Sequence, residues 1–308
     1  MAKSPTQPGR NPLFLMLILH DPRCVDYGSA VRPEQPARIT RTVAHLKASQ
    51  PGWTWRVPET VVDDALLRQA HTMAHVRRLE EPYDFDPDTP FFAGIGDHAR
   101  RSVAGAVDAV YHAITRGTPV FSLMRPPGHH AKTDAAMGFC YLNQIVLATL
   151  AAQGQFGAKR VAIWDFDAHH GNGTEAILHG RENVFFASVH QHPGYPGSGT
   201  HDLGPRTRNW PVAPDAPRTV HMAALRASLD AVVAFKPDLI LVSAGFDAYA
   251  RDPITMMTLE REDFATLGTW LRETRLPAAA ILEGGYSNEL PLLIEAFLAA
   301  WENPFPTV

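Results

Sequence analysis

Short apolar runs recur along the chain after residue 118, and helix-length stretches separate them. These runs lack the polar and apolar alternation of a half-exposed strand, so they are typical of strands buried on both faces. Such strands form a mostly parallel sheet with helices on both faces, which predicts an α/β fold. The runs are VFSLM (120–124), VAIW (161–164), VFFASV (184–189), LILVSA (239–244) and AAAIL (278–282).

The rest of the chain fits one domain over residues 1–308, with residues 1–12 as a flexible N-terminus. No repeat, low-complexity tract or Gly/Ser linker divides it. LFLMLIL (13–19) is predicted to be the first core strand, because it lacks the small-residue cleavage site of a signal peptide. Residues 192–217 are rich in Pro and Gly, so they predict a long loop without helix or strand. The predicted helices are 38–49, 101–114, 141–153, 173–180, 220–235, 262–274 and 288–301.

Charge and cysteine content narrow the classes of partner and compartment. A net charge of −4 argues against nucleic acid or an anionic membrane as the main partner, since both attract basic surfaces. Cys24 and Cys140 lie far apart without metal-finger or CxxC spacing, so neither a disulfide framework nor a cysteine zinc site is expected. A cytoplasmic location is therefore expected.

Polar clusters follow four of the predicted strands, at the point where each strand ends. They read RPPGHH, DFDAHHGN, GFDA and EGGY. Ligands of open parallel sheets bind beyond the carboxyl ends of the strands, where the connecting loops converge. The four clusters are therefore predicted to meet at one site.

The second and third clusters predict a metal site. Asp167 and His169 are two residues apart, so they project to the same side of an extended strand end, and Asp247 can approach from a neighbouring strand. Two carboxylates and one imidazole leave an open position for water, which is typical of a catalytic zinc site. Fe(II) or Mn(II) could occupy the same ligands.

The tandem His129 and His130 are predicted to be acid and base groups beside that metal. Their expected partners are Asp165 and Asn172, which belong to the motif that also supplies ligands. A carboxylate partner raises the basicity of an imidazole, whereas an amide orients the ring without adding charge. The two histidines should therefore differ in proton affinity. His170 is expected to lie behind the metal ligands.

These clusters resemble the signature blocks of the histone deacetylase superfamily, and are most similar to its class II and bacterial amidohydrolase members. The resemblance covers roughly residues 15–302. Asn172 is a class II mark, and RPEQPAR (32–38) resembles the family's HPExPxR with Arg32 in place of the histidine. The blocks are RPPGHHA (125–131), GFCYLN (138–143), DFDAHHGNGT (165–174), SAGFDA (243–248) and EGGY (283–286).

The resemblance implies an arginase-deacetylase fold and a role for each site residue. It implies Asp167, His169 and Asp247 as zinc ligands, His130 as general base, His129 as its electrostatic partner, and Tyr286 as the group that polarises the scissile carbonyl. It also implies a narrow substrate tunnel and a K⁺ or Na⁺ site. The tunnel residues would be Gly138, Phe139, Tyr195, Ile254 and Gly284. The monovalent-ion residues would be Asp165, Asp167, His169, Ser188 and Val189.

The implied reaction is zinc-dependent hydrolysis of an N-acyl amide of a primary amine. The substrate could be acetyl-lysine in a protein or peptide, or a small acetylated amine such as an acetylpolyamine. DPITMM (252–257) resembles acetylpolyamine amidohydrolases, and the acidic DFDPD (84–88) could attract cations. However, the chain has little room for the loop with which those enzymes dimerise, and Ile254 replaces a glutamate gatekeeper. Substrate and oligomeric state stay open.

Three other classes fit the motifs less well. A ureohydrolase needs D-A-H-x-D for two manganese ions, and this chain has Gly171 at the last acid. A non-catalytic acyl-lysine binding module would not need the intact ligands, base and Tyr286. A serine hydrolase of the α/β class would need a G-x-S-x-G elbow, which is absent from the sequence.

Overall fold

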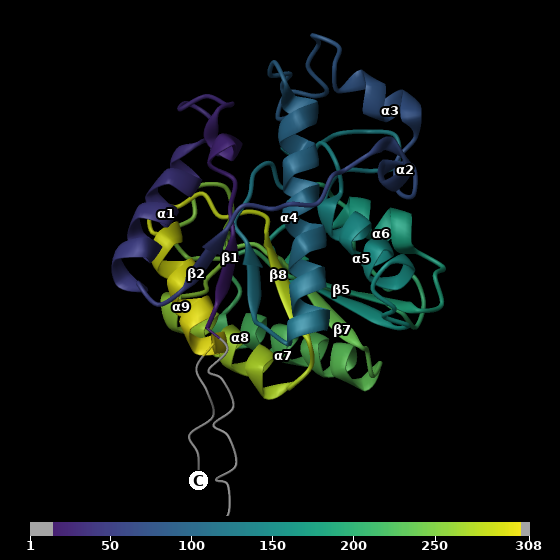
Figure 1. Ribbon diagram of the computed structural model, residues 1–308. Helices are drawn as coiled ribbons and strands as arrows, with labels where there is room; N and C mark the ends of the chain where they lie inside the picture. Colours follow the sequence, from purple (N-terminus) through teal and green to yellow (C-terminus); the bar gives the residue numbers. More distant parts are fainter. Residues whose placement is uncertain (1–14, 303–308) are drawn as a thin grey trace, which may run out of the picture.

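The computed structural model describes residues 15–302, so the expected flexible segment 1–12 lies outside the described residues. Its centre is an eight-stranded sheet in the order β2-β1-β3-β8-β7-β4-β5-β6, and every pair of neighbours is parallel (Figure 1). The strands are β1 (Leu17–Leu19), β2 (Thr54–Arg56), β3 (Val120–Ser122), β4 (Val161–Asp165), β5 (Val184–Gln191), β6 (Thr207–Val212), β7 (Leu239–Ala244) and β8 (Ala278–Leu282).

All five apolar runs after residue 118 form strands, as predicted, and the segment 13–19 contributes β1 from residue 17 onward. The prediction of a continuous loop over 192–217 is wrong, because β6 lies within it. This strand pairs with β5 from Thr207 to Val212, and its own residues include the strand formers Thr207, Trp210 and Val212. Pro211 is tolerated because β6 is an edge strand, where one row of amide groups needs no partner.

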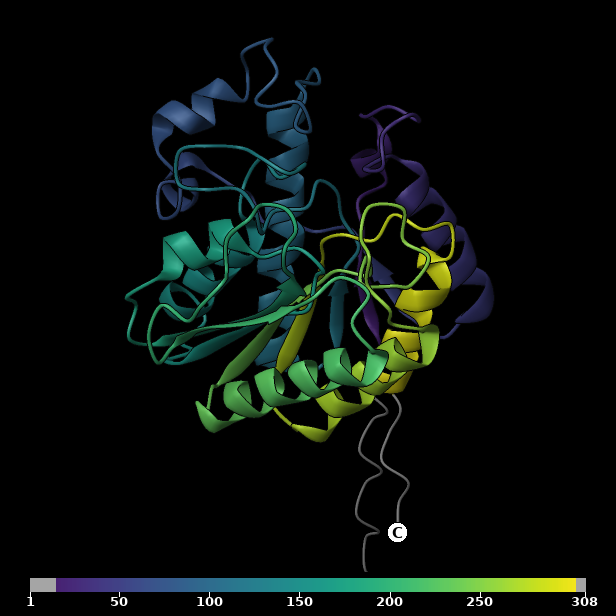
Figure 2. The same cartoon turned by 180° about the vertical axis from the view of Figure 1, so that it is seen from behind.

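Helices cover both faces of the sheet, as Figures 1 and 2 show from opposite sides. Along β4, Ala162 and Trp164 face one hydrophobic cluster, while Val161 and Ile163 face the other. Burial of both faces explains why the strand sequence lacks polar alternation. The first cluster includes α1 (Ala37–Ser49), α7 (Arg218–Ala234), α8 (Arg261–Glu273) and α9 (Leu290–Glu302). The second includes α2 (Asp64–Leu67), α3 (Met73–Arg78), α4 (Ile95–Arg116), α5 (Gln144–Gly154) and α6 (Asn172–Leu178).

The predicted helices all exist, and their ends differ by at most three residues except in α4, which begins at Ile95, six residues before the predicted start. Helix α5 begins later than expected because Asn143 caps it, accepting a hydrogen bond from the backbone N–H of Val146. Helices α2 and α3 are too short to show periodicity and were not predicted. No helix within residues 15–302 is both long enough and apolar enough to cross a membrane.

Strand order decides which loops meet. The strands β1 and β8 run upward in Figure 1, so their carboxyl ends and following loops lie above the helices α7 and α8. Because β3, β8, β7 and β4 are consecutive in the sheet, the loops after these strands adjoin one another. Those four loops carry the four polar clusters of the sequence.

Candidate active site

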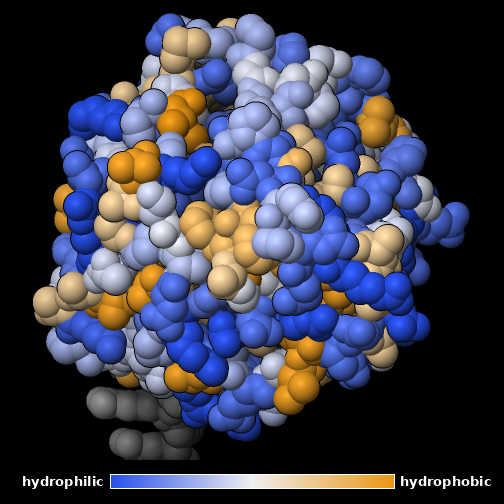
Figure 3. All heavy atoms as spheres, turned by 90° about the horizontal axis from the view of Figure 1, so that it is seen from above, coloured by the Kyte–Doolittle hydropathy of each residue, from blue (hydrophilic) through white to orange (hydrophobic). Residues whose placement is uncertain are grey.

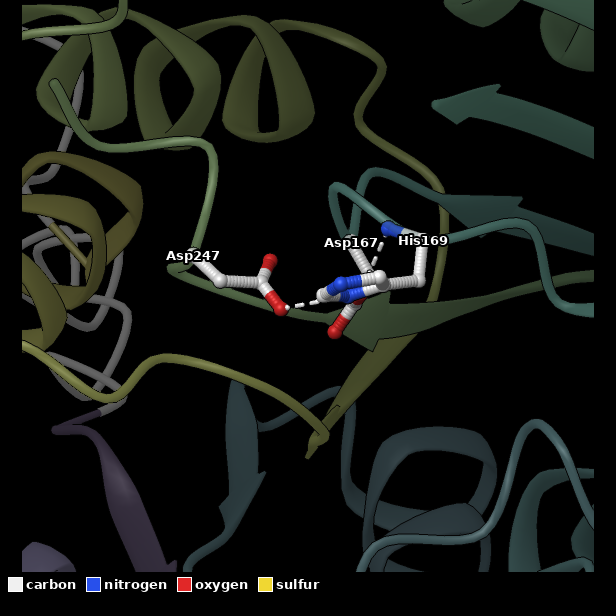
Figure 4. Close-up of side chains that lie close together, drawn as sticks. All are labelled: Asp167, His169 and Asp247. Carbon is white, nitrogen blue, oxygen red and sulfur yellow. Dashed lines mark hydrogen bonds and ion pairs between the residues drawn. The ribbon is translucent and has the colours of Figure 1, made fainter. Parts of the chain in front are cut away.

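A three-residue ligand set lies at the carboxyl ends of β4 and β7. Asp167, His169 and Asp247 offer ligand atoms that all lie within 4.8 Å of one another. His169 Nδ1 is 3.1 Å from Asp167 Oδ1 and 3.0 Å from Asp247 Oδ2 (Figure 4). Both carboxylates are fully buried. Their number and donor types fit a divalent cation with an open position.

Glycine packing makes room for this cluster. A Cβ atom on Gly284 would lie 2.1 Å from Asp247 Oδ2 and 2.6 Å from Asp167 Oδ2, which no side chain can tolerate. The N–H of Gly284 instead donates to Asp167 Oδ2 at 2.7 Å. Gly284 was expected on the tunnel wall, but the structure places it against the two carboxylates.

The electrostatics of the three side chains also fit a bound cation. Burial disfavours the charged form of Asp167, but His129 and His169 outweigh this and hold its pKa low. Burial and the neighbouring Asp167 raise the pKa of Asp247. Burial would lower the pKa of His169, but Asp247 and Asp167 raise it well above its usual value. Without a metal, the buried carboxylates of Asp167 and Asp247 therefore keep His169 protonated. A bound divalent cation could replace this proton as the positive charge between them.

The tandem histidines have the partners expected from the sequence. His129 Nδ1 lies 3.1 Å from Asp165 Oδ2, and His130 Nδ1 lies 2.7 Å from Asn172 Oδ1. The two rings are 4.1 Å apart between centroids. Because an amide oxygen only accepts, His130 carries its proton on Nδ1 when neutral, which leaves Nε2 free as an acceptor.

The two histidines differ in proton affinity, and the causes are visible. Burial lowers the pKa of His129, but the carboxylates of Asp167 and Asp165 outweigh it and raise that pKa to about 10. Burial, His129 and His169 together hold the pKa of His130 well below its usual value. At neutral pH the dyad therefore consists of a charged His129 and a neutral His130.

Tyr286 lies in the loop after β8. The Arg38 guanidinium carbon is 4.8 Å from the centroid of its ring, and burial raises the pKa of the phenol well above its usual value. The hydroxyl is therefore protonated at neutral pH and can donate a hydrogen bond. The backbone N–H of Tyr286 donates to Asp252 Oδ2 at 2.7 Å.

Asp252 is a buried carboxylate beside the site that the sequence did not predict. Its carboxylate is buried and accepts a second hydrogen bond, from the N–H of Ile254 to Oδ1 at 3.1 Å. Burial and the nearby Asp247 raise the pKa of Asp252 to about 7. The segment DPITMM was noted only for its resemblance, and the letters alone do not show that this carboxylate joins the loops after β7 and β8.

A cavity of about 240 Å³ leads to these groups. Figure 3 shows the face of the molecule that carries the loops after the strands, which is mostly hydrophilic with a mildly apolar patch near its centre. Four of the five expected tunnel residues line the cavity, and Gly284 does not. The lining residues are Arg32, Pro33, Asp88, His130, Gly138, Phe139, His169, Tyr195, Ile254 and Tyr286.

Aromatic rings and a glycine shape the cavity beside the base. The Tyr195 ring stands edge-on to His130 at 5.1 Å, and the Phe139 ring lies 5.7 Å from Tyr286. Gly138 has a φ of +57°, and a Cβ there would lie 2.5 Å from His130 Cδ2. A glycine is therefore required for the His130 ring to keep its position.

His170 anchors the loop that carries Tyr195. Its Nδ1 lies 2.8 Å from the Ser198 hydroxyl, and its Nε2 lies 3.3 Å from Glu175 Oε1. Its ring packs 4.6 Å from the ring of His190, whose Nε2 is 3.1 Å from the carbonyl oxygen of Gly199. This position is compatible with the expectation that His170 lies behind the metal ligands. Its contact with Ser198 could not be predicted from the sequence, because the two residues are brought together only by the fold.

The expected monovalent-ion residues also lie close together. Asp165 and Ser188 are directly opposite in the register of β4 and β5, and Val189 follows in β5. The Asp165 carboxylate contacts His129, and the Ser188 hydroxyl lies 2.9 Å from His190 Nδ1. The Asp165 carboxylate and the Ser188 hydroxyl therefore each contact a histidine, in addition to any ion that binds there.

Comparison with known proteins agrees with this architecture. The histone deacetylase domain family matches residues 32–300. The chain is 38% identical over 282 residues to a histone deacetylase-like amidohydrolase of Pseudomonas aeruginosa, covering 85% of this chain and 73% of the relative. It is 37% identical over 216 residues to acetylpolyamine amidohydrolase 1 of the same organism, covering 67% and 62%.

A solved structure shows the same fold. The crystal structure of an acetylpolyamine aminohydrolase from Burkholderia pseudomallei matches with a TM-score of 0.84 and 25% identity, over 93% of this chain and 98% of that one. The expected arginase-deacetylase fold is confirmed by this match and by the all-parallel sheet. With a family match that spans most of its length, the chain belongs to the histone deacetylase family.

Proposed function

We propose that the protein is a zinc-dependent deacetylase that releases a small acid, most simply acetate, from an N-acylated primary amine. The observation that carries the proposal is a histidine dyad with unlike partners, in which His129 meets a carboxylate and His130 meets an amide. A neutral His130 with a free Nε2 lines the same cavity as His169 and Tyr286. Hydrolysis of an amide needs a base, an electrophile and an oxyanion donor at one place, and these residues can provide or hold all three.

Zinc held by Asp167, His169 and Asp247 would supply Lewis acidity toward water and the acyl oxygen. His130 takes a proton from the attacking water through Nε2 and returns it to the departing amine. The neighbouring carboxylates, among them Asp165, keep His129 charged. Burial, together with this positive charge, keeps His130 neutral before reaction. Tyr286 donates its hydroxyl proton in a hydrogen bond to the developing oxyanion.

Two further assignments concern a monovalent-ion site and the cellular location. We place K⁺ or Na⁺ near Asp165, Asp167, His169, Ser188 and Val189, where one buried carboxylate faces a hydroxyl on the adjacent strand. We also assign the protein to the cytoplasm, because Cys24 and Cys140 are both buried free thiols.

Acetate release from zinc-loaded protein tests the proposal. The substrates should include an acetyl-lysine peptide, N-acetylputrescine and N-acetylspermidine, which also compares the two substrate branches. His130→Ala should lower kcat about 100- to 10,000-fold, as expected for loss of a general base. Tyr286→Phe should lower kcat about 100-fold through loss of an oxyanion donor.

Metal content separates loss of chemistry from loss of the ligand set. Both variants should bind zinc as the wild type does, because neither residue belongs to the ligand set. A wild type that binds zinc and a hydroxamate inhibitor but releases acid from none of these substrates would indicate a binding module. Normal kcat in either variant would contradict the role assigned to that residue.

A further inference from the structure

The cavity mouth carries one cationic and one anionic side chain, Arg32 and Asp88. Within residues 15–302, neither has an ion-pair partner at 4.0 Å or less. By contrast, Arg100 and Arg251, which lie elsewhere on the surface, are paired with carboxylates. Both charges at the mouth are therefore available to a ligand.

Arg32 is held in place without being neutralised. Its Nη1 donates to the carbonyl oxygen of Pro87 at 3.0 Å, and its Nε and Nη2 have no acceptor in the described part of the chain. Pro87 directly precedes Asp88, so the hydrogen bond keeps the guanidinium against the loop that carries the carboxylate. Opposite charges thus lie on the same side of the mouth.

Size and lining also limit the ligand. The wall between mouth and base consists of uncharged residues, including Phe139, Tyr195 and Ile254. A volume of about 240 Å³ is below the roughly 300–1,000 Å³ usual for drug-sized ligands, so it suits one slender acylated stem. The headgroup of that ligand would then meet Arg32 and Asp88.

We propose that this mouth binds the zwitterionic headgroup of a free ω-N-acyl amino acid such as Nε-acetyl-lysine. The α-carboxylate pairs with Arg32 and the α-ammonium pairs with Asp88. This proposal rests on the deacetylase function proposed above and specifies its substrate class. A residue inside a peptide offers neither charge, and an acetylated polyamine brings only cations to the guanidinium.

Three substrates with the same stem test the headgroup. Nε-acetyl-lysine carries both charges, N-acetylcadaverine lacks the carboxylate, and 6-acetamidohexanoate lacks the ammonium. The wild type should hydrolyse Nε-acetyl-lysine with a kcat/KM roughly 5- to 10-fold higher than either of the others, since a partly exposed charge pair contributes on the order of 1 kcal/mol. Most of the difference should be in KM, because the headgroup lies away from the reacting bond.

Each variant should weaken the preference for Nε-acetyl-lysine over a different competing substrate. Arg32→Ala should lower the kcat/KM ratio of Nε-acetyl-lysine to N-acetylcadaverine roughly 5-fold or more. Asp88→Asn should lower the ratio of Nε-acetyl-lysine to 6-acetamidohexanoate by a similar factor. Arg226→Ala is the control, because it removes the same charge from α7 on the other end of the molecule (Figure 1) and should leave both ratios unchanged.

The outcomes distinguish this proposal from the deacetylase function. Equal kcat/KM for all three substrates, or an Arg32→Ala variant with unchanged ratios, would overturn the headgroup assignment while the deacetylase activity stands. Acetate release from an acetyl-lysine peptide at a much higher kcat/KM than from the free amino acid would also overturn it. No acetate from any acetylated amine would instead reject the deacetylase function itself.

Discussion

Asp252→Asn tests whether one buried carboxylate positions the Tyr286 hydroxyl. Asp252 is 7% exposed, and its two oxygens accept from the backbone N–H groups of Tyr286 at 2.7 Å and Ile254 at 3.1 Å. Asparagine keeps the shape but has a single acceptor oxygen, so its NH₂ group must face one of the two N–H donors. At a pH well above the Asp252 pKa of about 7, where the carboxylate is charged, the substitution therefore removes one charge-assisted hydrogen bond, which contributes about 1.5–3 kcal/mol.

If the lost energy appears in the transition state through Tyr286, kcat should fall by about 10- to 100-fold. The zinc content should stay at the wild-type level, because Asp252 makes no hydrogen bond to Asp167, His169 or Asp247 in the described chain. The assay is steady-state acetate release with wild type, Asp252→Asn, Tyr286→Phe and the double variant. In the Tyr286→Phe background, Asp252→Asn should have little further effect on kcat.

Asp238→Asn provides a control for the loss of a carboxylate that accepts from two backbone N–H groups away from the site. Asp238 Oδ2 accepts from the backbone N–H groups of Lys159 and Arg160 at 2.8 and 2.9 Å. These residues precede β7 and β4, so they lie at the amino ends of the strands, away from the site. Asp238→Asn should leave kcat unchanged. The reasoning is refuted if Asp252→Asn lowers kcat by the same factor with and without the Tyr286 hydroxyl, since that result would indicate a general effect on the fold.

Three further predictions concern metal and stability. Asp247→Ala should abolish stoichiometric zinc in the purified protein, measured by mass spectrometry, and retained zinc would contradict the ligand set. Glu34→Gln leaves the buried Arg125 without its carboxylate, so the free energy of unfolding in urea should fall by about 3–5 kcal/mol; a change below 1 kcal/mol would contradict this. Burial lowers the pKa values of three histidines, so below pH 6.5 the unfolded chain binds protons that the folded state does not. Between pH 6.5 and 5 each such histidine should lower the free energy of unfolding by about 1.5 kcal/mol, and a His221→Phe variant with the same pH dependence as the wild type would count against this. The histidines are His71, His190 and His221, with pKa values of about 4, 3 and 4.

The sequence could predict the buried strands and the side chains at their ends, because both signals are local. A strand buried on both faces needs continuous apolar residues, and VAIW shows this without any knowledge of its neighbours. The spacing of Asp167 and His169 likewise places them on one side of a strand end. Their meeting with Asp247 could be predicted because carboxyl ends of parallel strands share one edge of the sheet.

Features that depend on contacts between distant segments could not be predicted in this way. Strand β6 was missed because its pairing with β5 stabilises a segment whose Pro and Gly content is typical of a loop. Gly284 lies under the two carboxylates because β8 is the neighbour of β7, which only the strand order shows.

By itself, the sequence determined the class of fold, and it predicted which residues form the candidate donor set and the candidate acid and base groups. Only the tertiary structure decided that the Asp252 carboxylate accepts a hydrogen bond from the Tyr286 backbone. It also decided that Arg32 and Asp88 line one cavity, where neither has an ion-pair partner within residues 15–302. The physical reason is that a side chain's chemistry is set by its own atoms, whereas its burial, partners and charge state are set by segments far away in the chain.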